Sequence, residues 1–130
     1  MSQPLDERGL PAGYQFRPEW EWTPRAVRDA RTALGEPILL LDCRTDQERA
    51  IATIDGSMHV PLHDLERKLD DIRDAAEDLG TSTIVVHCHH GMRSLRAAAV
   101  LRAAGFPTAA SMAGGIDLWS TDIDPRVPRY

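Results

Sequence analysis

The sequence predicts an α/β protein, a three-layer sandwich around a mainly parallel five-stranded sheet. Short runs of apolar β-formers alternate along the chain with segments of helical periodicity, the order typical of parallel strands joined by helices. Two of these runs, 38–41 and 84–86, are apolar at every position, which is typical of strands covered on both faces. A length of 130 residues suits one domain with a single core.

The N-terminal part of the chain predicts an arm followed by a helix. Residues 1–22 are rich in Pro, Gly, Trp and charge and have no clean period, so we expect an irregular arm that packs on the domain. Thr23 and Pro24 have the form of an N-cap followed by proline at the first helical position. The helix that begins there is expected to end with Leu34, before Gly35.

The remaining elements alternate in the same way. The run 38–42 predicts a strand, and Thr45 and Glu48 have the spacing of a capping box that opens a short helix. Further strands are expected at 57–61, 82–88 and 108–112, and further helices at 62–79, with a break near Asp70-Asp71, at 95–104 and at 115–119. The chain is expected to divide into the arm 1–22, a domain 23–120 and an extended tail 121–130.

Composition and charge narrow the class of protein. The 15 basic and 20 acidic residues give a formal net charge of −5, which disfavours a broad surface for nucleic acid or anionic membranes. The first residues have no signal-peptide pattern, and the apolar runs are too short to span a membrane. Cys43 and Cys88 are too few for a disulfide framework. We expect a cytoplasmic monomer with no cofactor and no nucleic-acid or membrane partner.

Cys88 lies where the strand 82–88 gives way to a helical segment. Such a turn points backbone N–H groups and the positive end of a helix dipole inward, which stabilises an anion and favours the thiolate. A buried cysteine that merely ends a core strand is the alternative, but it does not explain the Gly91, Arg93 and Ser94 that follow. The turn therefore predicts cysteine nucleophile chemistry.

Other segments are expected at the same place as Cys88. In open parallel sheets, functional residues gather beyond the carboxyl ends of the strands. This rule brings residues 42–44, 88–94 and 113–115 to one edge of the sheet. Residues far apart in the sequence thus become candidates for one pocket.

The sequence from Cys88 to Ser94 matches the C-x-x-G-x-R-S loop of the rhodanese sulfurtransferases. Three more segments resemble that family in the same order: Leu41-Asp42-Cys43-Arg44 with Glu48, Ile54 to Pro61, and Gly114 to Trp119. The chain thus resembles a single rhodanese domain over residues 23–120. It departs from the family at Thr53, Asp55 and Cys43, where His, Pro and Val are usual.

The resemblance implies a rhodanese-like fold and a sulfurtransferase that needs no cofactor. The Cys88 thiolate would attack a donor such as thiosulfate or a low-molecular-weight persulfide, become a persulfide, and pass the outer sulfur to a thiol, to cyanide or to a protein acceptor. The persulfide would be held by the loop residues His89, His90, Gly91, Met92, Arg93 and Ser94, and the loop would be supported by Asp42, Arg44 and Glu48.

Two loop side chains have alternative interpretations. Arg93 can pair with Asp42 or Glu48 to brace the loop, or can hold an anionic substrate group, and we favour the brace. Ser94 can cap the following helix or donate to the sulfur, and we favour the cap.

The remaining polar side chains around Cys88 are harder to assign. His89 and His90 are expected to be exposed to solvent in preference to a role in proton transfer. With His87 they suggest a metal site, but the spacings of zinc ligands are absent, so no metal is expected. Cys43 either faces the core as a small apolar residue, which we favour, or faces the pocket and acts on the Cys88 persulfide.

Other functions compete with a small-molecule sulfurtransferase. Phosphatases of the same fold have a C-x5-R loop, whereas four residues separate Cys88 from Arg93 here, which suits a sulfur atom better than a phosphoryl group. A non-catalytic module that binds a partner, or a sulfur carrier that acts on a protein, are further alternatives. The complete loop favours catalysis.

Overall fold

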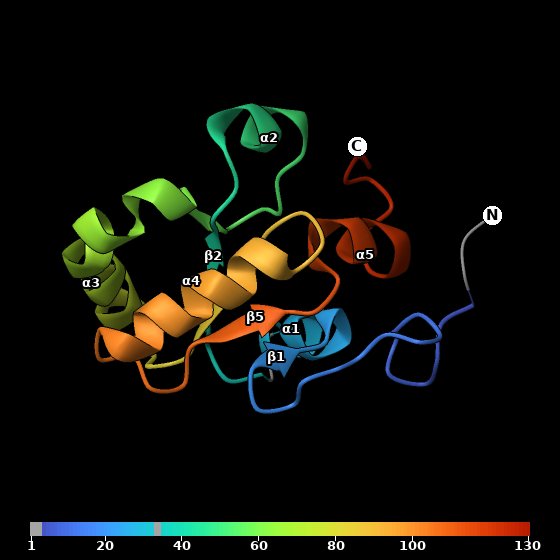
Figure 1. Cartoon of the computed structure of the whole chain (residues 1–130), viewed down its shortest axis with the longest axis horizontal. Helices are drawn as coiled ribbons and strands as arrows, with labels where there is room; N and C mark the ends of the chain where they lie inside the picture. The colour runs from blue at the N-terminus through green and yellow to red at the C-terminus, as the bar shows by residue number, and fades with distance from the viewer. Residues whose placement is uncertain (1–3, 33–34) are drawn as a thin grey trace.

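The computed structural model describes residues 4–32 and 35–130 and contains a five-stranded, all-parallel sheet (Figure 1). The strand order is β1-β5-β4-β2-β3. The strands are β1 (Glu21–Trp22), β2 (Leu39–Asp42), β3 (Met58–His59), β4 (Ile84–His87) and β5 (Ala110–Met112). The helices are α1 (Pro24–Ala30), α2 (Asp46–Ile51), the 3-10 helix η1 (Leu62–Lys68), α3 (Leu69–Leu79), α4 (Met92–Ala103) and α5 (Gly115–Asp122). The predicted α/β class and parallel sheet are confirmed.

The sheet is the middle of three layers. One core cluster packs η1, α3 and α4 on one face of β2 and β4, and it includes Leu41, Leu65, Ile72, Val86 and Leu101. A second cluster packs α1 and α5 on the opposite face, and it includes Val27, Leu40, Val85, Ile116 and Trp119. Because successive strand residues such as Leu40 and Leu41 point to opposite faces, each position of the central strands is buried. This is the physical reason for the uninterrupted apolar runs.

The helix caps predicted from the sequence are present. Thr45 Oγ1 accepts from the Glu48 backbone N–H (3.2 Å), and Glu48 Oε1 accepts from the Thr45 backbone N–H (3.3 Å), which completes the capping box. Thr23 caps α1 by accepting from the Ala26 N–H at 3.1 Å. Helix α1 ends at Ala30, earlier than predicted, and Leu34 lies outside the described residues.

Other element boundaries also differ from the prediction. The arm is not irregular throughout, since Glu21–Trp22 form β1 and pair in parallel with β5 at the edge of the sheet. The helical segment 62–79 changes from 3-10 to α geometry between Lys68 and Leu69, just before the expected break. Helix α4 begins at Met92 instead of Leu95, because the preceding turn closes within four residues.

The C-terminal segment is folded back on the domain. Helix α5 continues to Asp122, and the Val127 N–H donates to the Asp124 carbonyl oxygen (3.1 Å), which makes a turn in the tail that we expected to be extended. Val127 is buried in the core cluster of α1 and α5. Within residues 4–32 and 35–130, no helix has the length and apolar character needed to cross a membrane.

Candidate active site

The carboxyl ends of β2 and β4 place the two cysteines next to each other. These strands pair in parallel register up to Asp42 and His87, and the Cys43 N–H continues the ladder by donating to the His87 carbonyl oxygen (3.1 Å). The next residue of each strand, Cys43 and Cys88, therefore points to the same face. Both belong to the core cluster beneath α4. Cys43 is thus a core residue and a neighbour of Cys88 at once, so the two interpretations of Cys43 are not exclusive.

The Cys88 sulfur is held by the turn that leads into α4. Cys88 Sγ accepts from the Gly91 backbone N–H (3.1 Å) and from the Ser94 backbone N–H (3.4 Å), and Ser94 Oγ lies 3.3 Å away. The residue is only 1% exposed. Two backbone donors at the start of a helix make this position suited to a sulfur anion.

The two thiols have opposite tendencies to ionise. The pKa of Cys88 is lowered, first by the hydrogen bond from the Cys43 side chain and then by the Ser94 hydroxyl and the loop N–H groups, which together outweigh burial. The pKa of Cys43 is raised, because this thiol donates to Cys88 and is itself buried. These opposite shifts favour the thiolate at Cys88 and the proton at Cys43.

Two glycines allow the close approach of backbone around the loop. Gly91 has φ 112°, a conformation that side chains with a β-carbon resist, and it begins α4. Gly115 has φ 61°, and a β-carbon there would lie 2.3 Å from the His89 carbonyl oxygen. The absence of that carbon lets the Ile116 N–H donate to the Cys88 carbonyl oxygen (2.9 Å), which ties α5 to the loop.

Ser94 acts on the sulfur and does not cap the helix. Gly91 occupies the N-cap position of α4. Ser94 Oγ instead lies between Cys88 Sγ (3.3 Å) and Ser111 Oγ (2.7 Å). Ser111 on β5 is fully buried. Sequence reasoning missed Ser111, although a lone serine in the predicted last strand is the signal by which it could have been found.

Arg93 braces the loop against α2, as the favoured interpretation predicts. Its guanidinium donates from Nη1 to Glu48 Oε1 (2.5 Å) and from Nη2 to Glu48 Oε2 (2.9 Å). This ion pair lowers the pKa of the Glu48 carboxyl and raises that of Arg93. Glu48 thus accepts from both terminal nitrogens of the guanidinium, which is the contact that a brace requires.

A second ion pair, fully buried, lies in the segment between β2 and α2. Arg44 donates from Nε to Asp42 Oδ1 (2.9 Å) and from Nη2 to Asp42 Oδ2 (2.7 Å), and both side chains are inaccessible to solvent. Arg49 of α2 also donates to Asp42 Oδ2, at 3.2 Å. The sequence did not single out Arg49. These contacts fix the segment between β2 and α2 that carries Cys43 and Glu48.

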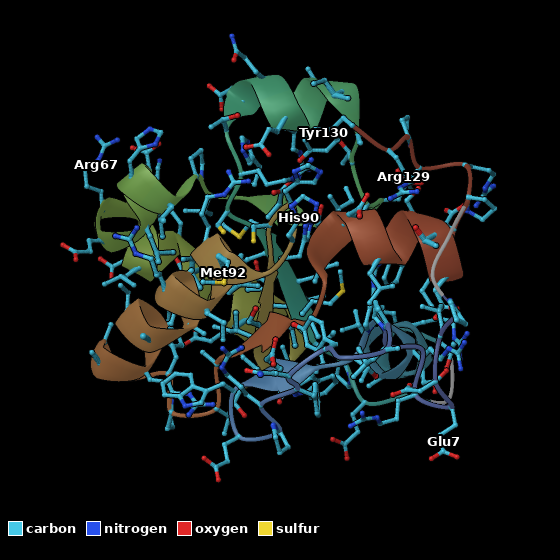
Figure 2. All side chains as sticks on the ribbon, turned by 45° about the vertical axis from the view of Figure 1, so that its right-hand side comes forward. Glu7, Arg67, His90, Met92, Arg129 and Tyr130 are labelled. Carbon is cyan, nitrogen blue, oxygen red and sulfur yellow. The ribbon has the colours of Figure 1, made fainter. Side chains whose placement is uncertain are left out.

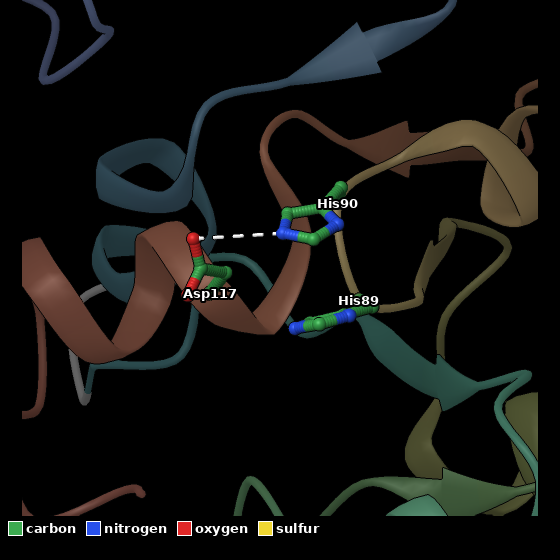
Figure 3. Close-up of side chains that lie close together, drawn as sticks. All are labelled: His89, His90 and Asp117. Atoms are coloured by element: carbon green, nitrogen blue, oxygen red, sulfur yellow. Dashed lines mark ion pairs between the residues drawn. The ribbon is translucent and has the colours of Figure 1, made fainter. Parts of the chain in front are cut away.

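The two loop histidines meet Asp117 of α5 (Figure 3). His90 is exposed, and its Nε2 lies 3.7 Å from Asp117 Oδ2. His89 is half-buried, and this burial lowers the pKa of its imidazole. We expected both histidines to be exposed to solvent, and only His90 is. The ligand atoms of these three residues lie within 4.8 Å of one another, a grouping that the loop spacing alone did not predict. Arg129 donates to both Asp117 oxygens (2.9 and 3.3 Å), so a cation would have to displace its guanidinium.

The end of the C-terminal tail lies beside the loop. Figure 2 labels Tyr130 and His90 at the loop that follows Cys88, and Met92 at the start of α4, where this residue is 70% exposed. The Tyr130 ring stacks on His89, with centroids 4.0 Å apart, and its hydroxyl donates to Glu48 Oε2 (2.6 Å). The tail therefore connects the loop after Cys88 to helix α2. No feature of the sequence pointed to this role of Tyr130.

Comparison with known sequences gives one consistent family. Residues 25–122 match the rhodanese-like domain. The chain is 41% identical over 97 residues to adenylyltransferase and sulfurtransferase MOCS3-1 of Zea mays, which covers 74% of this chain and 21% of that protein. It is 32% identical over 108 residues to probable adenylyltransferase/sulfurtransferase MoeZ of Mycobacterium tuberculosis, covering 83% of this chain and 26% of that protein. The chain thus spans about a fifth to a quarter of the length of these relatives.

The fold has solved counterparts. Human single-domain sulfurtransferase TSTD1 superimposes with a TM-score of 0.65 at 23% identity, over 78% of this chain and 96% of that one. At this level of identity the likeness concerns the fold alone, and it agrees with the architecture described above.

Proposed function

The chain belongs to the rhodanese-like domain family, and from this membership we propose that it is a sulfurtransferase that carries a sulfane sulfur as a persulfide on Cys88. The observation that carries the proposal is the donor set at Cys88 Sγ, with backbone N–H groups of Gly91 and Ser94 at 3.1 and 3.4 Å. A thiolate is the nucleophilic form of cysteine, and these donors stabilise it.

The reaction proceeds in two transfers. In the first, Cys88 Sγ attacks the outer sulfur of a donor such as thiosulfate; the new S–S bond forms as the bond to sulfite breaks, and sulfite leaves with the electron pair. In the second, a nucleophilic acceptor attacks the outer sulfur of the persulfide and Cys88 leaves as the thiolate. The loop N–H groups stabilise the anion before and after each transfer. No external oxidant is needed.

The loop favours this chemistry over phosphate hydrolysis. Four residues lie between Cys88 and Arg93, one fewer than in the C-x5-R loops of phosphatases. Arg93 is also bound at both ends by Glu48, so its fork does not point at the sulfur as a phosphate-binding arginine would. We therefore rank phosphatase activity below sulfur transfer.

A protein acceptor is the second candidate for the outgoing sulfur. The relatives from Zea mays and Mycobacterium tuberculosis are named as adenylyltransferase and sulfurtransferase, and this chain corresponds to only part of each. A domain of that kind suits delivery of sulfur to another protein as well as to a thiol or cyanide. We retain the cytoplasm as the compartment, because both cysteines are free and a reducing environment keeps them so.

Sulfur transfer to cyanide is the direct test. Initial rates should be measured for the wild type and for Cys88→Ser, with thiosulfate and glutathione persulfide as donors side by side. We expect Cys88→Ser to lose turnover with both donors, because the thiolate that would carry the sulfur is absent. The persulfide donor should be used better than the dianion thiosulfate, since the loop has His89 and Ser94 where basic residues would favour an anion.

The result has a clear contrary outcome. Equal turnover by Cys88→Ser, in a variant whose unfolding midpoint matches that of the wild type, excludes Cys88 as the nucleophile. Cys88-dependent hydrolysis of an aryl phosphate at a rate above sulfur transfer would favour the phosphatase alternative.

A further inference from the structure

Cys43 is a buried nucleophile that the two transfers above do not use. It is 2% exposed, about as buried as Cys88, which is 1% exposed. Its neighbour in the core cluster is Cys88, the residue that the proposed function loads with sulfur. A thiol placed beside a persulfide has a reaction of its own available, because thiols attack sulfur–sulfur bonds.

The strand register brings the two cysteines within disulfide range. β2 and β4 pair in parallel from Leu39 with Ile84 to Asp42 with His87, and the ladder continues through the Cys43 N–H to the His87 carbonyl oxygen. Neighbouring strands lie about 4.8 Å apart. Disulfides span Cα separations of about 4.4–6.8 Å. Both side chains also lie on the same face of the sheet, in the same core cluster.

Different groups surround the Cys88 sulfur on the side of the loop and on the side of strand β2. The loop supplies the Gly91 and Ser94 N–H groups, at 3.1 and 3.4 Å from Sγ, and Cys43 approaches from the neighbouring strand. The loop N–H groups are suited to a departing anionic sulfur, and the Cys43 side is where a second thiol can attack.

We propose that Cys43 resolves the Cys88 persulfide by forming a Cys43–Cys88 disulfide and releasing the carried sulfur as hydrosulfide. This inference rests on the proposed function, since it needs the persulfide to form. It makes the chain a source of sulfide when no acceptor takes the outer sulfur.

The step balances without an external oxidant. Cys43 Sγ attacks Cys88 Sγ, the bond between Cys88 Sγ and the outer sulfur breaks, and the outer sulfur leaves with the electron pair. The proton of the Cys43 thiol goes to that sulfur, giving HS⁻. The sulfane sulfur is reduced by two electrons and the two thiols are oxidised to the disulfide. A dithiol, or two monothiols, must then reduce the disulfide to restore the Cys88 thiolate.

The resting pair holds the proton where this step requires it. The pKa of Cys43 is raised, first by its interaction with the Cys88 side chain and then by burial, which favours the proton on Cys43. Once Cys88 carries the outer sulfur, its negative charge moves to that atom, and the Cys43 proton neutralises the sulfide as it leaves. No other titratable side chain has to move.

The test compares the wild type with Cys43→Ser and Cys43→Val under anaerobic conditions. Serine keeps a hydroxyl donor for Cys88 but cannot form a disulfide, and valine keeps the approximate volume without a donor. Each reduced, full-length protein is given thiosulfate without an acceptor. Released sulfide is quantified, and intact and peptide masses are recorded after the free thiols are blocked.

We expect the wild type to release about one equivalent of sulfide and to lose about 2 Da in a Cys43–Cys88 disulfide. Both variants should instead keep a gain of about 32 Da on Cys88 and release less than about a tenth of that sulfide. A stable persulfide on wild-type Cys88 without sulfide release overturns the inference, and so does a gain of mass on Cys43.

Failure of the proposed function has a different signature. If neither the wild type nor Cys43→Ser takes up sulfur on Cys88 and no sulfide appears, with thiosulfate or with glutathione persulfide in a parallel sample, persulfide formation itself is excluded. If Cys43→Ser holds the persulfide and the wild type does too, only the role of Cys43 is excluded.

Discussion

Arg93 and Glu48 hold each other through two parallel hydrogen bonds, at 2.5 and 2.9 Å, although they lie 45 residues apart in the sequence. Arg93 is in the first turn of α4, directly after the thiol loop, and Glu48 closes the capping box of α2. The side chains of α2 are exposed or half-buried, so apolar packing contributes little to its position. This ion pair therefore links the orientation of α2 to the orientation of the loop.

Removal of that link should reduce both catalysis and stability. For Arg93→Met we expect kcat/KM for sulfur transfer to fall by about ten- to a hundredfold, because the loop N–H groups shift relative to Cys88 Sγ. The unfolding free energy should fall by about 1–3 kcal/mol, the range for a hydrogen bond between charged groups. Arg96→Met, on an exposed position of the same helix, is the matched control and should change neither value appreciably. Measurements are cyanide-coupled rates and urea unfolding.

A second substitution tests whether the two parallel hydrogen bonds of the Arg93 guanidinium are needed, or only its charge. Arg93→Lys keeps the charge but cannot donate two parallel hydrogen bonds, so it should recover less than half of the lost activity. Full activity in Arg93→Lys would mean that charge alone matters and that the two-pronged contact does not position the loop.

The fold was predictable because its determinants are local. The uninterrupted apolar runs of β2 and β4 and the Thr45–Glu48 capping box report short-range physics that does not depend on the rest of the chain. β1 was not predictable in this way. Its two residues form a strand only because the edge of β5 accepts them, with the Ser111 N–H donating to the Trp20 carbonyl oxygen (2.8 Å). Edge pairing of this kind leaves no periodic pattern.

The candidate site was predictable in part for a related reason. The loop residues follow one another, so the turn chemistry of Cys88, Gly91 and Ser94 is visible in a single segment. The contacts of Ser111 and Tyr130 depend instead on how β5 and the tail pack, which the sequence pattern does not encode. The preference for Ser94 as a cap was wrong because Gly91 already takes the N-cap position.

Gly115 should be the least replaceable glycine near the loop. Its φ of 61° disfavours a side chain, and an alanine β-carbon would lie 2.3 Å from the His89 carbonyl oxygen. We expect Gly115→Ala to lower the unfolding free energy by about 2–4 kcal/mol, combining the backbone penalty with displacement of the loop. The control is Gly105→Ala, also at positive φ (103°) but with no described atom within 4 Å, which should cost about 1 kcal/mol. Equal losses in urea unfolding would show that the contact with His89 is unimportant.

Tyr130 should limit access to the thiol. Its ring stacks on His89, the residue after Cys88, and its hydroxyl binds Glu48, while the Cys88 sulfur is almost inaccessible to solvent. Tyr130→Ala is expected to raise the rate of Cys88 alkylation by iodoacetamide about three- to tenfold, because a low-stability contact no longer has to open first. Arg126→Ala, in the same tail and exposed, should leave the rate unchanged. A slower reaction in Tyr130→Ala would mean that the tail orders the loop and does not restrict entry.

The pH dependence of the chain should carry the signature of the Cys88 thiolate. Its pKa is lowered from the ordinary 9.0, chiefly by the Cys43 side chain. Alkylation of Cys88 should therefore reach its plateau well below pH 9, and the midpoint should move upward in Cys43→Val, which lacks the donor.

The same shift makes stability depend on pH in a defined direction. Between the folded and unfolded pKa of Cys88 the unfolded chain binds more protons, so this contribution to stability grows as pH rises, is complete above the unfolded value, and is lost as pH falls through the folded one. His87, whose pKa burial lowers to about 4, adds a loss of stability of the same sign below its ordinary 6.5. Thermal unfolding of the wild type and of Cys88→Ser from pH 5 to 8 separates the contribution of Cys88 from that of His87, because both proteins contain His87. The difference in midpoint should widen as pH rises, and a constant difference would exclude a thiolate at Cys88.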